Sequence, residues 1–543
     1  MIEVRGVGQR AGGGRRTLRD VSLTIESGEL VAIIGGSGAG KTTLLDAIAG
    51  VRPPAEGEVR FDGEAPVDGD ARVNGEAGVK GGARSFGYVP QDDIVHLEMP
   101  LRRTLRYAAG LRLPSGTPPE RAERAVDAVM DALALTERAG QRVGSLSGGE
   151  RKRASIAVEL LTRPRVFFLD EPTSGLDPAT AADLMRLLRG LADSGTTVVL
   201  TTHHPPDVAV CDRVAVLTQD GRLAFYGEPD VAREEFRVEA IADIYLRLAG
   251  TEAHEWEGRF GDEPAPAEGP GVGAFGQWAL LARRNLDLLS RNRLTLAVLA
   301  GSPVMVLAMF AVLFRPGAFS PESPSPGATV MILFWIAFGG FFFGLTYGLL
   351  QICTELPVVR RERLTGLRVG PYVLAKVAVL LPLLALVDAL MLGVLRGLDR
   401  LPAMGWGTYA ELFVTLLLCS LAALALGLLV SAAVTDPAQA TMALPMLCFP
   451  QVLFVGAILP VPVMAAPGRW LSYAMSNRWA FEGLGRSVGV ERLWGSGRSP
   501  LGPPLLASYG DTFARAVAVD WAVLAGFTAA FLAGTCLVLA RRT

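Results

Sequence analysis

The chain has 543 residues, which is too long for one ordinary domain, so we expect at least two. Lysine and arginine number 52 against 54 acidic residues, and this formal charge of −2 leaves no basic excess for binding nucleic acid. Half of the residues are hydrophobic, only 20% are charged and the mean hydropathy is +0.34. Such a composition is rare in a soluble enzyme and typical of a chain with several membrane spans.

The five cysteines are scattered without a CxxC pair, so the sequence indicates neither a zinc site nor a disulfide framework. Residues 1–16 contain no apolar core. We therefore expect no signal peptide and a cytoplasmic N-terminal half.

Residues 1–250 have the composition of a soluble α/β domain. Apolar runs such as Leu30–Ile34, Val166–Leu169 and Val198–Leu200 alternate with helical segments, which predicts a mostly parallel sheet. Residues 251–274 are rich in Gly, Pro, Ala and acids and are interpreted as a linker. From residue 275 to 543 the chain predicts an all-α membrane domain.

A glycine-rich segment directly follows the apolar run Leu30–Ile34 and fits the pattern GxxxxGK[ST]. In this pattern backbone N–H groups turn inward around phosphates, the lysine reaches the outer phosphates and the hydroxyl ligates Mg²⁺. A bare strand–helix turn is the less favoured interpretation, because strand, lysine and threonine are all in place. The candidate phosphate-binding residues are Gly35, Gly36, Ser37, Gly38, Ala39, Gly40, Lys41, Thr42 and Thr43.

A second apolar run, Val166–Leu169, ends in two adjacent acids. Asp170 is suited to hold Mg²⁺ opposite Thr42, and Glu171 is suited to orient or deprotonate an attacking water. Two acids at the end of a strand are usually only solvated, but the phosphate loop favours the functional interpretation.

The segment Leu146-Ser147-Gly148-Gly149-Glu150, 20 residues before Asp170, resembles the signature of ATP-binding cassette proteins. The remaining motifs of that family also occur in this chain, in the order in which the family has them. Gln91 resembles its Q-loop glutamine, Ser174–Asp177 its D-loop and His203 its switch histidine. No aromatic residue occurs in Val7–Arg16, where many cassettes stack the adenine, so the contacts of the base stay open.

The resemblance implies an ATPase with the cofactors ATP and Mg²⁺ and an α/β P-loop NTPase cassette fold. It assigns catalytic roles to Glu171, His203 and Gln91. It assigns the metal to Thr42, Gln91 and Asp170. It also implies nucleotide contacts for Ser147, Gly148, Gly149 and Asp177, with Ser147 and Gly149 contacting the γ-phosphate bound by the other subunit of a dimer.

Six apolar stretches in the second half reach the roughly 20 residues that a helix needs to cross a bilayer. They lie at about 294–314, 328–351, 375–395, 411–434, 439–460 and 518–540. Arginines gather before the first stretch, between the second and third, and after the last. This bias predicts that the N-terminal domain and the C-terminus are cytoplasmic.

A cassette ahead of six spans resembles the G subfamily of half-transporters, and the likeness covers almost the whole chain. Residues 275–293 resemble its amphipathic connecting helix, and Glu355–Arg363 lies in a loop that the subfamily uses to receive the cassette's motion. Phe343 lies where multidrug members of the subfamily place a phenylalanine that clamps flat substrates, and Gly456–Leu459 resembles the apolar plug above that cavity. Asp388, inside the third stretch, is either a substrate or gating contact or part of a helix–helix hydrogen bond. A helix–helix hydrogen bond is the favoured interpretation of Asp388.

The favoured function is a half-transporter in the plasma membrane that exports a hydrophobic or amphipathic small molecule, or a lipid. The expected partners are an identical or similar subunit, the lipid membrane and the cargo, but no nucleic acid. A mechanotransmitter that moves no solute is the alternative, although such systems usually carry a large external domain. An importer would need a substrate-binding partner, and the spans exclude a soluble ATPase.

Overall fold

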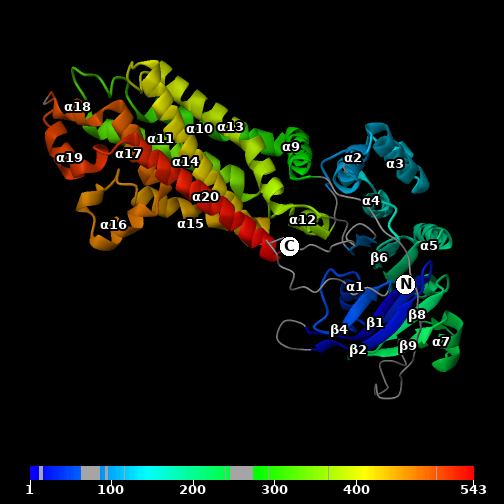
Figure 1. Ribbon diagram of the computed structural model, residues 1–543. Coiled ribbons are helices and arrows are strands. Elements are labelled where there is room, and N and C mark those ends of the chain that lie inside the picture. Colours follow the sequence, from blue (N-terminus) through cyan, green and yellow to red (C-terminus); the bar gives the residue numbers. More distant parts are fainter. Residues whose placement is uncertain are drawn as a thin grey trace. The chain divides into compact units, whose positions relative to one another are not determined.

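The computed structural model describes residues 1–10, 16–62, 86–91, 96–114, 116–238, 240–241, 243–244, 273–291, 293–364, 366–496 and 498–542 (Figure 1). The chain divides into two compact units. Unit 1 comprises Met1–Leu280 with Arg360–Arg368, and unit 2 comprises Leu281–Val359 with Val369–Thr543. The predicted linker lies outside the described residues except for its last two positions, 273 and 274, where helix α9 begins.

Unit 1 is built on a six-stranded sheet. In spatial order its strands are β5 (Phe86–Val89), β6 (Val166–Asp170), β7 (Thr197–Thr201), β3 (Leu30–Gly35), β8 (Arg213–Leu217) and β9 (Leu223–Gly227). Each neighbouring pair is parallel except β8 and β9, which are antiparallel. The prediction of a mostly parallel α/β domain is therefore confirmed. Because β6 and β7 are neighbours, Asp170 pairs with Thr201 at the carboxyl edge of the sheet.

A second, antiparallel sheet contains β2 (Arg16–Ile25), β1 (Ile2–Arg10) and β4 (Glu56–Phe61) in that order. The central strand β3 is buried throughout, and its side chains alternate between two cores. Leu30, Ala32 and Ile34 pack with the helical side of unit 1, whereas Val31 and Ile33 pack with helix α1 and the second sheet. This double burial explains why the strand reads as a continuous apolar run.

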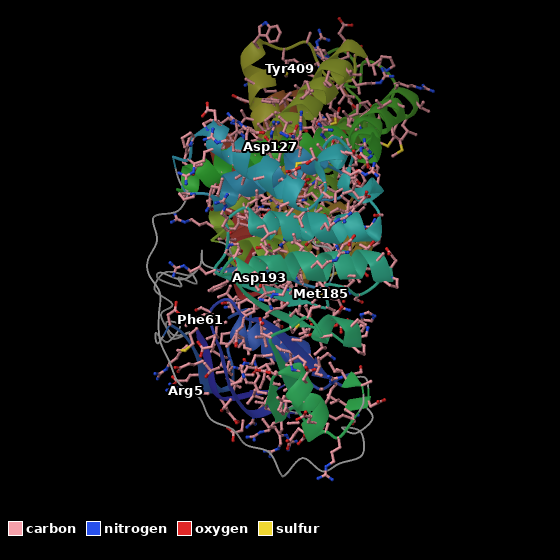
Figure 2. All side chains as sticks on the ribbon, turned by 90° about the vertical axis from the view of Figure 1, so that its right-hand side faces the viewer. Arg5, Phe61, Asp127, Met185, Asp193 and Tyr409 are labelled. Carbon is pink, nitrogen blue, oxygen red and sulfur yellow. The ribbon has the colours of Figure 1, made fainter. Side chains whose placement is uncertain are left out.

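The helices of unit 1 follow these strands. They are α1 (Lys41–Ile48), α2 (Leu101–Arg112), α3 (Pro119–Ala132), α4 (Gly148–Leu160), α5 (Pro178–Asp193), α6 (Pro205–Val208) and α7 (Pro229–Glu235), with single 3₁₀ turns at Thr136–Arg138 and Val143–Ser145. Arg5 and Phe61 mark the antiparallel sheet in Figure 2, and Met185 and Asp193 mark α5. Two further helices contribute to this unit, the start of α9 (Ala274–Arg291) and the second half of α12 (Leu356–Leu364).

Unit 2 is helical. Its remaining helices are α10 (Arg293–Leu313), α11 (Pro326–Leu349), α13 (Val369–Gly397), α14 (Trp406–Ala433), α15 (Pro437–Leu453), α16 (Ala466–Tyr473), α17 (Ser476–Val488), α18 (Val490–Gly495), α19 (Gly502–Tyr509) and α20 (Val517–Arg542), with 3₁₀ turns at Val461–Val463 and Gly510–Phe513. The long helices run side by side, and α16, α18 and α19 gather at one end of the bundle (Figure 1).

Helices α11 and α14 approach each other through glycines. A Cβ at Gly348 would lie 2.5 Å from the carbonyl oxygen of Leu424, and a Cβ at Gly427 would lie 2.7 Å from that of Leu345. Small residues allow such close backbone packing between membrane helices. At one end of the contact the Ser431 hydroxyl oxygen accepts hydrogen bonds from the backbone N–H groups of Ile352 and Cys353, at 2.9 and 3.0 Å.

Among the described residues, four helices are long and apolar enough to cross a membrane: α11, α13, α14 and α20. They agree with four of the six predicted stretches. The first predicted stretch is helical as α10 (Arg293–Leu313). The fifth is helical only as α15, which has 17 residues and ends at Leu453. Pro445 and Pro450 lie inside that helix, and neither has an N–H to donate to its backbone hydrogen bonds. The count of six spans stays a prediction.

Candidate nucleotide site

The phosphate loop joins the end of β3 to the start of α1. Gly40 precedes the helix with a left-handed φ of 93°, and a Cβ there would lie 2.8 Å from the carbonyl oxygen of Thr17. A Cβ at Gly35 would similarly lie 2.7 Å from the carbonyl oxygen of Leu217. Glycine is thus required at both ends of the loop, which leaves the backbone N–H groups of the helix start available to an anion.

Lys41 is the first residue of α1, and its ammonium folds back over the loop. Its Nζ donates hydrogen bonds to the carbonyl oxygens of Gly35 and Gly36, at 3.0 and 3.3 Å. The ammonium therefore lies over the same backbone turn that would surround a phosphate, as the motif predicts.

Asp170 ends strand β6 beside the phosphate loop and is only 4% exposed. Its Oδ1 accepts hydrogen bonds from the hydroxyls of Thr42, at 3.1 Å, and Thr201, at 2.5 Å. A hydroxyl oxygen and a carboxylate oxygen at this separation suit a hard cation such as Mg²⁺. The residues present therefore fit the predicted metal.

Glu171 follows Asp170 in a strained backbone conformation, with a φ of 44°. Its backbone N–H donates to the Thr201 hydroxyl at 2.9 Å. Its carboxylate is approached from two sides, by Gln91 Nε2 at 3.2 Å from one oxygen and by His203 Nδ1 at 3.3 Å from the other. The structure thus brings together the three residues that the sequence proposes as catalytic.

Thr201 is a residue of this site that the sequence analysis missed. Its hydroxyl is fully buried, donates to the Asp170 carboxylate and accepts from the Glu171 backbone, so it fixes both acids at once. The signal was present in the sequence. Thr201 ends the apolar run Val198–Leu200, and parallel neighbouring strands bring their carboxyl ends to one edge.

The signature segment has a different environment. Ser147 is the N-cap of α4 and forms a capping box with Glu150: the Ser147 hydroxyl accepts from the Glu150 backbone, and the Glu150 carboxylate accepts from the Ser147 backbone. Arg138 donates to the same carboxylate at 2.8 Å. The Ser147 backbone N–H and then Arg138 lower the pKa of the Glu150 carboxyl, so it stays ionised at neutral pH.

Gly148 and Gly149 form the first turn of α4 after this cap, and a Cβ at Gly149 would lie 2.8 Å from the Thr180 side chain. In the described part of the chain, the hydrogen bonds of Ser147 run within its own helical turn. The structure therefore does not join the predicted signature residues to the phosphate loop of the same chain.

Asp177 is the N-cap of α5, where its carboxylate accepts a hydrogen bond from the Thr180 backbone at 3.0 Å. Hydrogen bonds from the side chain and backbone of Thr180 lower the pKa of Asp177. Its observed contacts are those of a helix cap. Its predicted contact with nucleotide stays a prediction.

The second half of α12 packs into unit 1 through Arg361. Its guanidinium donates to the Glu159 carboxylate at 2.6 Å, to the Ser155 hydroxyl at 3.2 Å and to the Ser155 carbonyl oxygen at 2.7 Å. Arg112 donates to the same carboxylate at 2.5 and 2.9 Å, and all three charged side chains are buried. Burial opposes ionisation of Glu159, but the charges of Arg112 and Arg361 outweigh it and lower its pKa.

The segment after α12 is held by Gln277 of α9. Its side-chain nitrogen donates to the Gly366 carbonyl oxygen, and its side-chain oxygen accepts from the Arg368 backbone, both at 3.0 Å. In unit 2, Glu355 accepts a hydrogen bond from the Tyr372 hydroxyl at 3.1 Å and forms an ion pair with Lys376 at 2.7 Å. Both ends of the predicted loop Glu355–Arg363 therefore carry buried or partly buried ion pairs.

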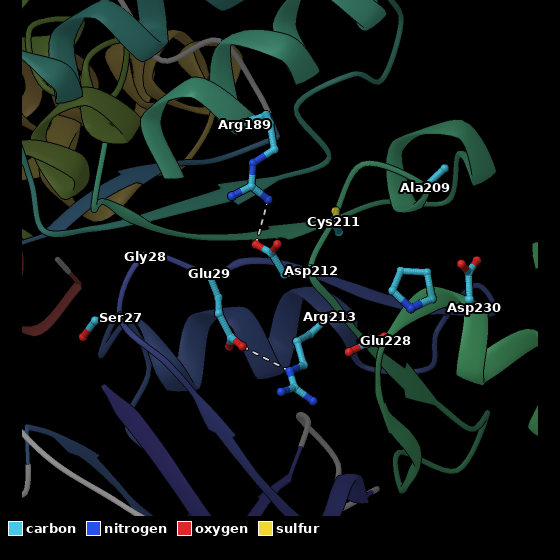
Figure 3. Close-up of a pocket in the computed structure, with 11 residues that line it drawn as sticks. Ser27, Gly28, Glu29, Arg189, Ala209, Cys211, Asp212, Arg213, Glu228 and Asp230 are labelled. Atoms are coloured by element: carbon cyan, nitrogen blue, oxygen red, sulfur yellow. Dashed lines mark hydrogen bonds and ion pairs between the residues drawn. The ribbon is translucent and has the colours of Figure 1, made fainter. Parts of the chain in front are cut away.

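A cavity of about 540 Å³ in unit 1 lies among charged residues (Figure 3). Arg189 pairs with Asp212 at 2.7 Å, and Arg213 pairs with Glu29 at 3.1 Å. None of the predicted nucleotide residues lines this cavity. Its arginines are paired with acids of the same chain, and the cavity lies apart from the predicted nucleotide residues.

The weaker membrane candidates all lie in unit 2. Phe343 is buried inside the helical bundle, and both Ile458 and Leu459 are exposed. Asp388 on α13 is fully buried beside Ser420 of α14. Among the described residues neither carboxylate oxygen of Asp388 has a hydrogen-bond partner, so the helix–helix hydrogen bond favoured from the sequence stays a prediction.

Comparison with known families gives two matches. Residues 18–174 match the family described as ABC transporter, and residues 276–486 match the family described as ABC-2 type transporter. The first match includes the phosphate loop, Gln91, the signature and Asp170. The second begins within α9 and includes α10 to α16 and most of α17.

Two curated relatives illustrate the likeness. The ABC transporter ATP-binding/permease protein Rv1747 of Mycobacterium tuberculosis is 33% identical over 512 residues, which cover 91% of this chain and 58% of that protein. ATP-binding cassette sub-family G member 5 of Mus musculus is 41% identical over 226 residues, which cover 40% of this chain and 33% of that protein. The chain thus spans less than two thirds of the length of either relative.

Among solved structures, cbiO1 from Clostridium perfringens, part of the ABC transporter complex cbiONQ, is 27% identical with a TM-score of 0.39. The match covers 46% of this chain and 95% of that one. The two family matches and their order along the chain agree with the resemblance seen in the motifs. The chain belongs to the ATP-binding cassette transporter family and is integral to the membrane, with its cassette ahead of an ABC-2 type membrane domain, the domain order seen in the G subfamily.

Proposed function

We propose that this protein hydrolyses ATP and uses the energy to export a hydrophobic or amphipathic small molecule, or a lipid, across the plasma membrane. The observation that carries the proposal is the convergence of Gln91 and His203 on the Glu171 carboxylate, next to Asp170 and the phosphate loop. A carboxylate held from two sides can orient a water molecule for attack on the γ-phosphate.

In this proposal the phosphate loop binds the phosphates through the backbone N–H groups of Gly36 to Thr43, and Lys41 swings from the loop carbonyls to the outer phosphates. Thr42, Asp170 and Gln91 would hold Mg²⁺, which neutralises charge on the phosphates. Glu171 accepts a proton from the attacking water, and His203 keeps the Glu171 side chain in place. Thr201 fixes Asp170 and the Glu171 backbone so that neither acid has to reorganise.

We further infer that the working unit is a dimer, most simply of identical chains. Ser147, Gly148 and Gly149 lie at the start of α4, where helix N–H groups favour an anion, yet Ser147 is not hydrogen-bonded to the chain's own phosphate loop. In a two-fold dimer this end of α4 would meet the γ-phosphate bound by the partner. A membrane domain of about six spans would also obtain the second wall of its conduit from the partner.

The buried ion pairs of Arg361 support coupling between ATP hydrolysis and the membrane domain. Removal of one partner from a buried charge cluster is costly, so Arg361, Glu159 and Arg112 hold α12 firmly against α4 and α2. Because α12 lies between α11 and α13 in the chain, displacement of α4 would be passed on to two membrane helices. Arg361 makes the observed contacts with α4, so it is the residue to test for coupling.

Export is favoured over import because the chain carries cassette and membrane domain together and its apolar helices suit an apolar cargo. The arginines near the spans support cytoplasmic placement of the cassette and of the C-terminus. In a transport assay, ATP must therefore be supplied on the side of the membrane where the cassette lies.

The test uses the full chain, purified and reconstituted in liposomes with outward-facing cassettes. A panel of drugs and lipids is screened for stimulation of ATPase activity, and each stimulating compound is then assayed for ATP-dependent accumulation in the lumen. We expect at least one compound to do both, and the Glu171→Gln variant to accumulate none. Stimulated hydrolysis without movement of any compound would favour the mechanotransmitter and overturn the export proposal.

The coupling step has its own variant, Arg361→Met. We expect this variant to bind ATP normally and keep its basal hydrolysis within a few-fold, while losing stimulation by transported compounds. Arg360→Met, next to it on α12, is the matched control and should retain stimulation. Equal loss of ATP binding in the Arg361 variant would indicate a folding defect instead.

A further inference from the structure

Lys152 is a buried lysine on the signature helix that the proposed chemistry does not yet use. Its side chain is only 4% exposed, and it lies five residues after the cap residue Ser147. Its Nζ donates hydrogen bonds to the carbonyl oxygens of Pro90 and Gln91, at 3.2 and 2.8 Å. One ammonium on α4 therefore holds two successive peptide units of the Q-loop.

These contacts determine where the Gln91 side chain can lie. Strand β5 ends at Val89, so within the described residues Pro90 and Gln91 lie beyond the β5–β6 ladder. The Gln91 amide nitrogen nevertheless reaches the Glu171 carboxylate at 3.2 Å. Hydrogen bonds from a charged donor are about twice as strong as neutral ones, so the Lys152 ammonium is well suited to fix this segment.

Burial of a lysine is unfavourable unless the charge is well solvated by protein groups. A leucine or methionine would fill the same space between α4 and the Q-loop without that cost. The position is therefore better explained by what the ammonium does to the two carbonyl groups than by packing alone.

The same helix carries the signature at its first turn. Ser147 and Lys152 are separated by five residues of one helix, a rise of about 7.5 Å. The capping box fixes the start of that helix. Because a helix of this length moves as a rigid body, a change at Ser147 displaces the Lys152 ammonium and, with it, the backbone that carries Gln91.

We propose that Lys152 is a positioning residue that transmits the state of the signature segment to the Gln91–Glu171 pair of the same chain. The inference rests on the proposed function, in which Ser147 contacts nucleotide bound by the partner while Glu171 acts on the chain's own nucleotide. Lys152 then makes hydrolysis at one site depend on whether the other site is closed.

The first test is a double-mutant cycle on the full-length protein, with Lys152→Met and Gln91→Ala alone and combined. We expect Lys152→Met to lower kcat about 10-fold, with KM for ATP and the thermal unfolding temperature little changed. In the Gln91→Ala background the same substitution should lower kcat less than 2-fold, because its target is already gone. Equal fold-losses in both backgrounds would overturn the proposal.

Arg153→Met is the matched control, since Arg153 is the next cation on α4 and no hydrogen-bond partner for it occurs in the described part of the chain. It should leave kcat within 2-fold of wild type. If Lys152→Met does not fold, Lys152→Arg replaces it in the same cycle. Arginine keeps a positive donor but places it differently, so its loss of kcat should also shrink when Gln91 is absent.

The second test uses mixed dimers assembled from differently tagged copies. Each dimer contains one Lys152→Met and one Glu171→Gln substitution, either on the same chain or on opposite chains. On the same chain, the remaining intact Glu171 keeps its own Lys152, and activity should be about half that of wild type. On opposite chains, the only intact Glu171 lies in the chain without Lys152, and activity should fall about 10-fold further.

Equal activity of the two arrangements would refute transmission within one chain. Failure of the proposed function gives a different result. In that case Glu171→Gln in both chains would hydrolyse ATP near the wild-type rate, whatever residue occupies position 152.

Discussion

The Glu171 carboxylate and the signature cap at Ser147 belong to the same cassette but have opposite surroundings. Glu171 is approached by side chains from two other segments, with Gln91 and His203 both within 3.3 Å. Ser147 hydrogen-bonds within its own helical turn. One region is assembled from several segments of a single chain, whereas the other is a helix start that, among the described residues, hydrogen-bonds only within its own turn.

The difference shows which residues of the predicted site one chain can hold in place by itself. Parallel strands β6 and β7 bring Asp170 and Thr201 to one edge, so the acid side of the site forms when the sheet forms. A helix start such as that of α4 needs only a local cap to be stable. The signature can therefore fold without nucleotide. In the proposed dimer it would then contact the nucleotide that the partner subunit binds.

The largest expected effect is the loss of ATP hydrolysis in the Glu171→Gln variant, which tests the region that one chain assembles. Loss of a carboxylate that accepts a proton should reduce kcat by about 100-fold or more while ATP binding is retained. Steady-state hydrolysis and equilibrium binding of labelled ATP measure the two quantities. Glu234→Gln, an acid on α7, is the control and should behave as wild type. Near-normal turnover of the Glu171 variant would remove it from the catalytic role.

The next effect is a lower rate of ATP hydrolysis in mixed dimers of wild type and Ser147→Arg, which tests the signature region. If Ser147 serves the nucleotide of the partner, one variant chain should spoil one site and also depress turnover at the other. The total rate should then fall to well below half of wild type. The mass of the ATPase-active particle in detergent should correspond to two chains. A single chain hydrolysing ATP at the full rate would refute the dimer.

An intermediate effect is expected for Thr201→Val, which keeps the shape of the side chain but removes its hydroxyl. The Asp170 carboxylate and the Glu171 backbone would each lose a hydrogen bond, and a bond to a charged group contributes about 1.5–3 kcal/mol. We expect kcat to fall about 10-fold or more, and more Mg²⁺ to be needed for half-maximal rate. The neighbouring Thr197→Val, at the other end of β7, should leave the Mg²⁺ dependence unchanged.

The smallest effect is on the signature cap, with Glu150→Gln. Loss of the Glu150 carboxylate charge should lower the free energy of unfolding by about 1 kcal/mol at neutral pH, as for other helix caps. The folded-state pKa of Glu150 is lowered, so its stabilisation is present above the ordinary carboxyl pKa and is lost as the pH falls through the lowered value. Unfolding of wild type and variant should therefore converge in acid. A difference that persists unchanged at low pH would contradict this account.

The sequence predicted the elements of the cassette well because its motifs have fixed local geometry. The run Leu30–Ile34, the glycines after it and the acids after Leu169 are all adjacent in sequence, so their chemistry could be read directly. Glu171 is predicted from the two acids after Leu169, whereas Gln91 and His203 are inferred from family likeness, and the structure brings both within hydrogen-bond distance of Glu171. Their roles stay predictions until activity is measured.

Contacts between distant segments could not be predicted. Lys152 and Arg361 look like ordinary cations in the sequence, since nothing local shows that their partners are the Gln91 backbone and the buried Glu159 carboxylate. The fifth predicted stretch is helical only to Leu453, and hydropathy gives no sign of that end because the residues that follow are also apolar. Composition predicts burial in lipid, but it does not give the residue at which a helix ends.

The glycine contact between α11 and α14 limits how the membrane domain can move. Backbones this close leave no room for one helix to slide or rotate against the other, because carbonyl oxygens already lie where any side chain would be. The hydrogen bonds of Ser431 add a fixed end point to the pair. We therefore expect any change of shape in the helical unit to displace α11 and α14 together, as a single stiff element.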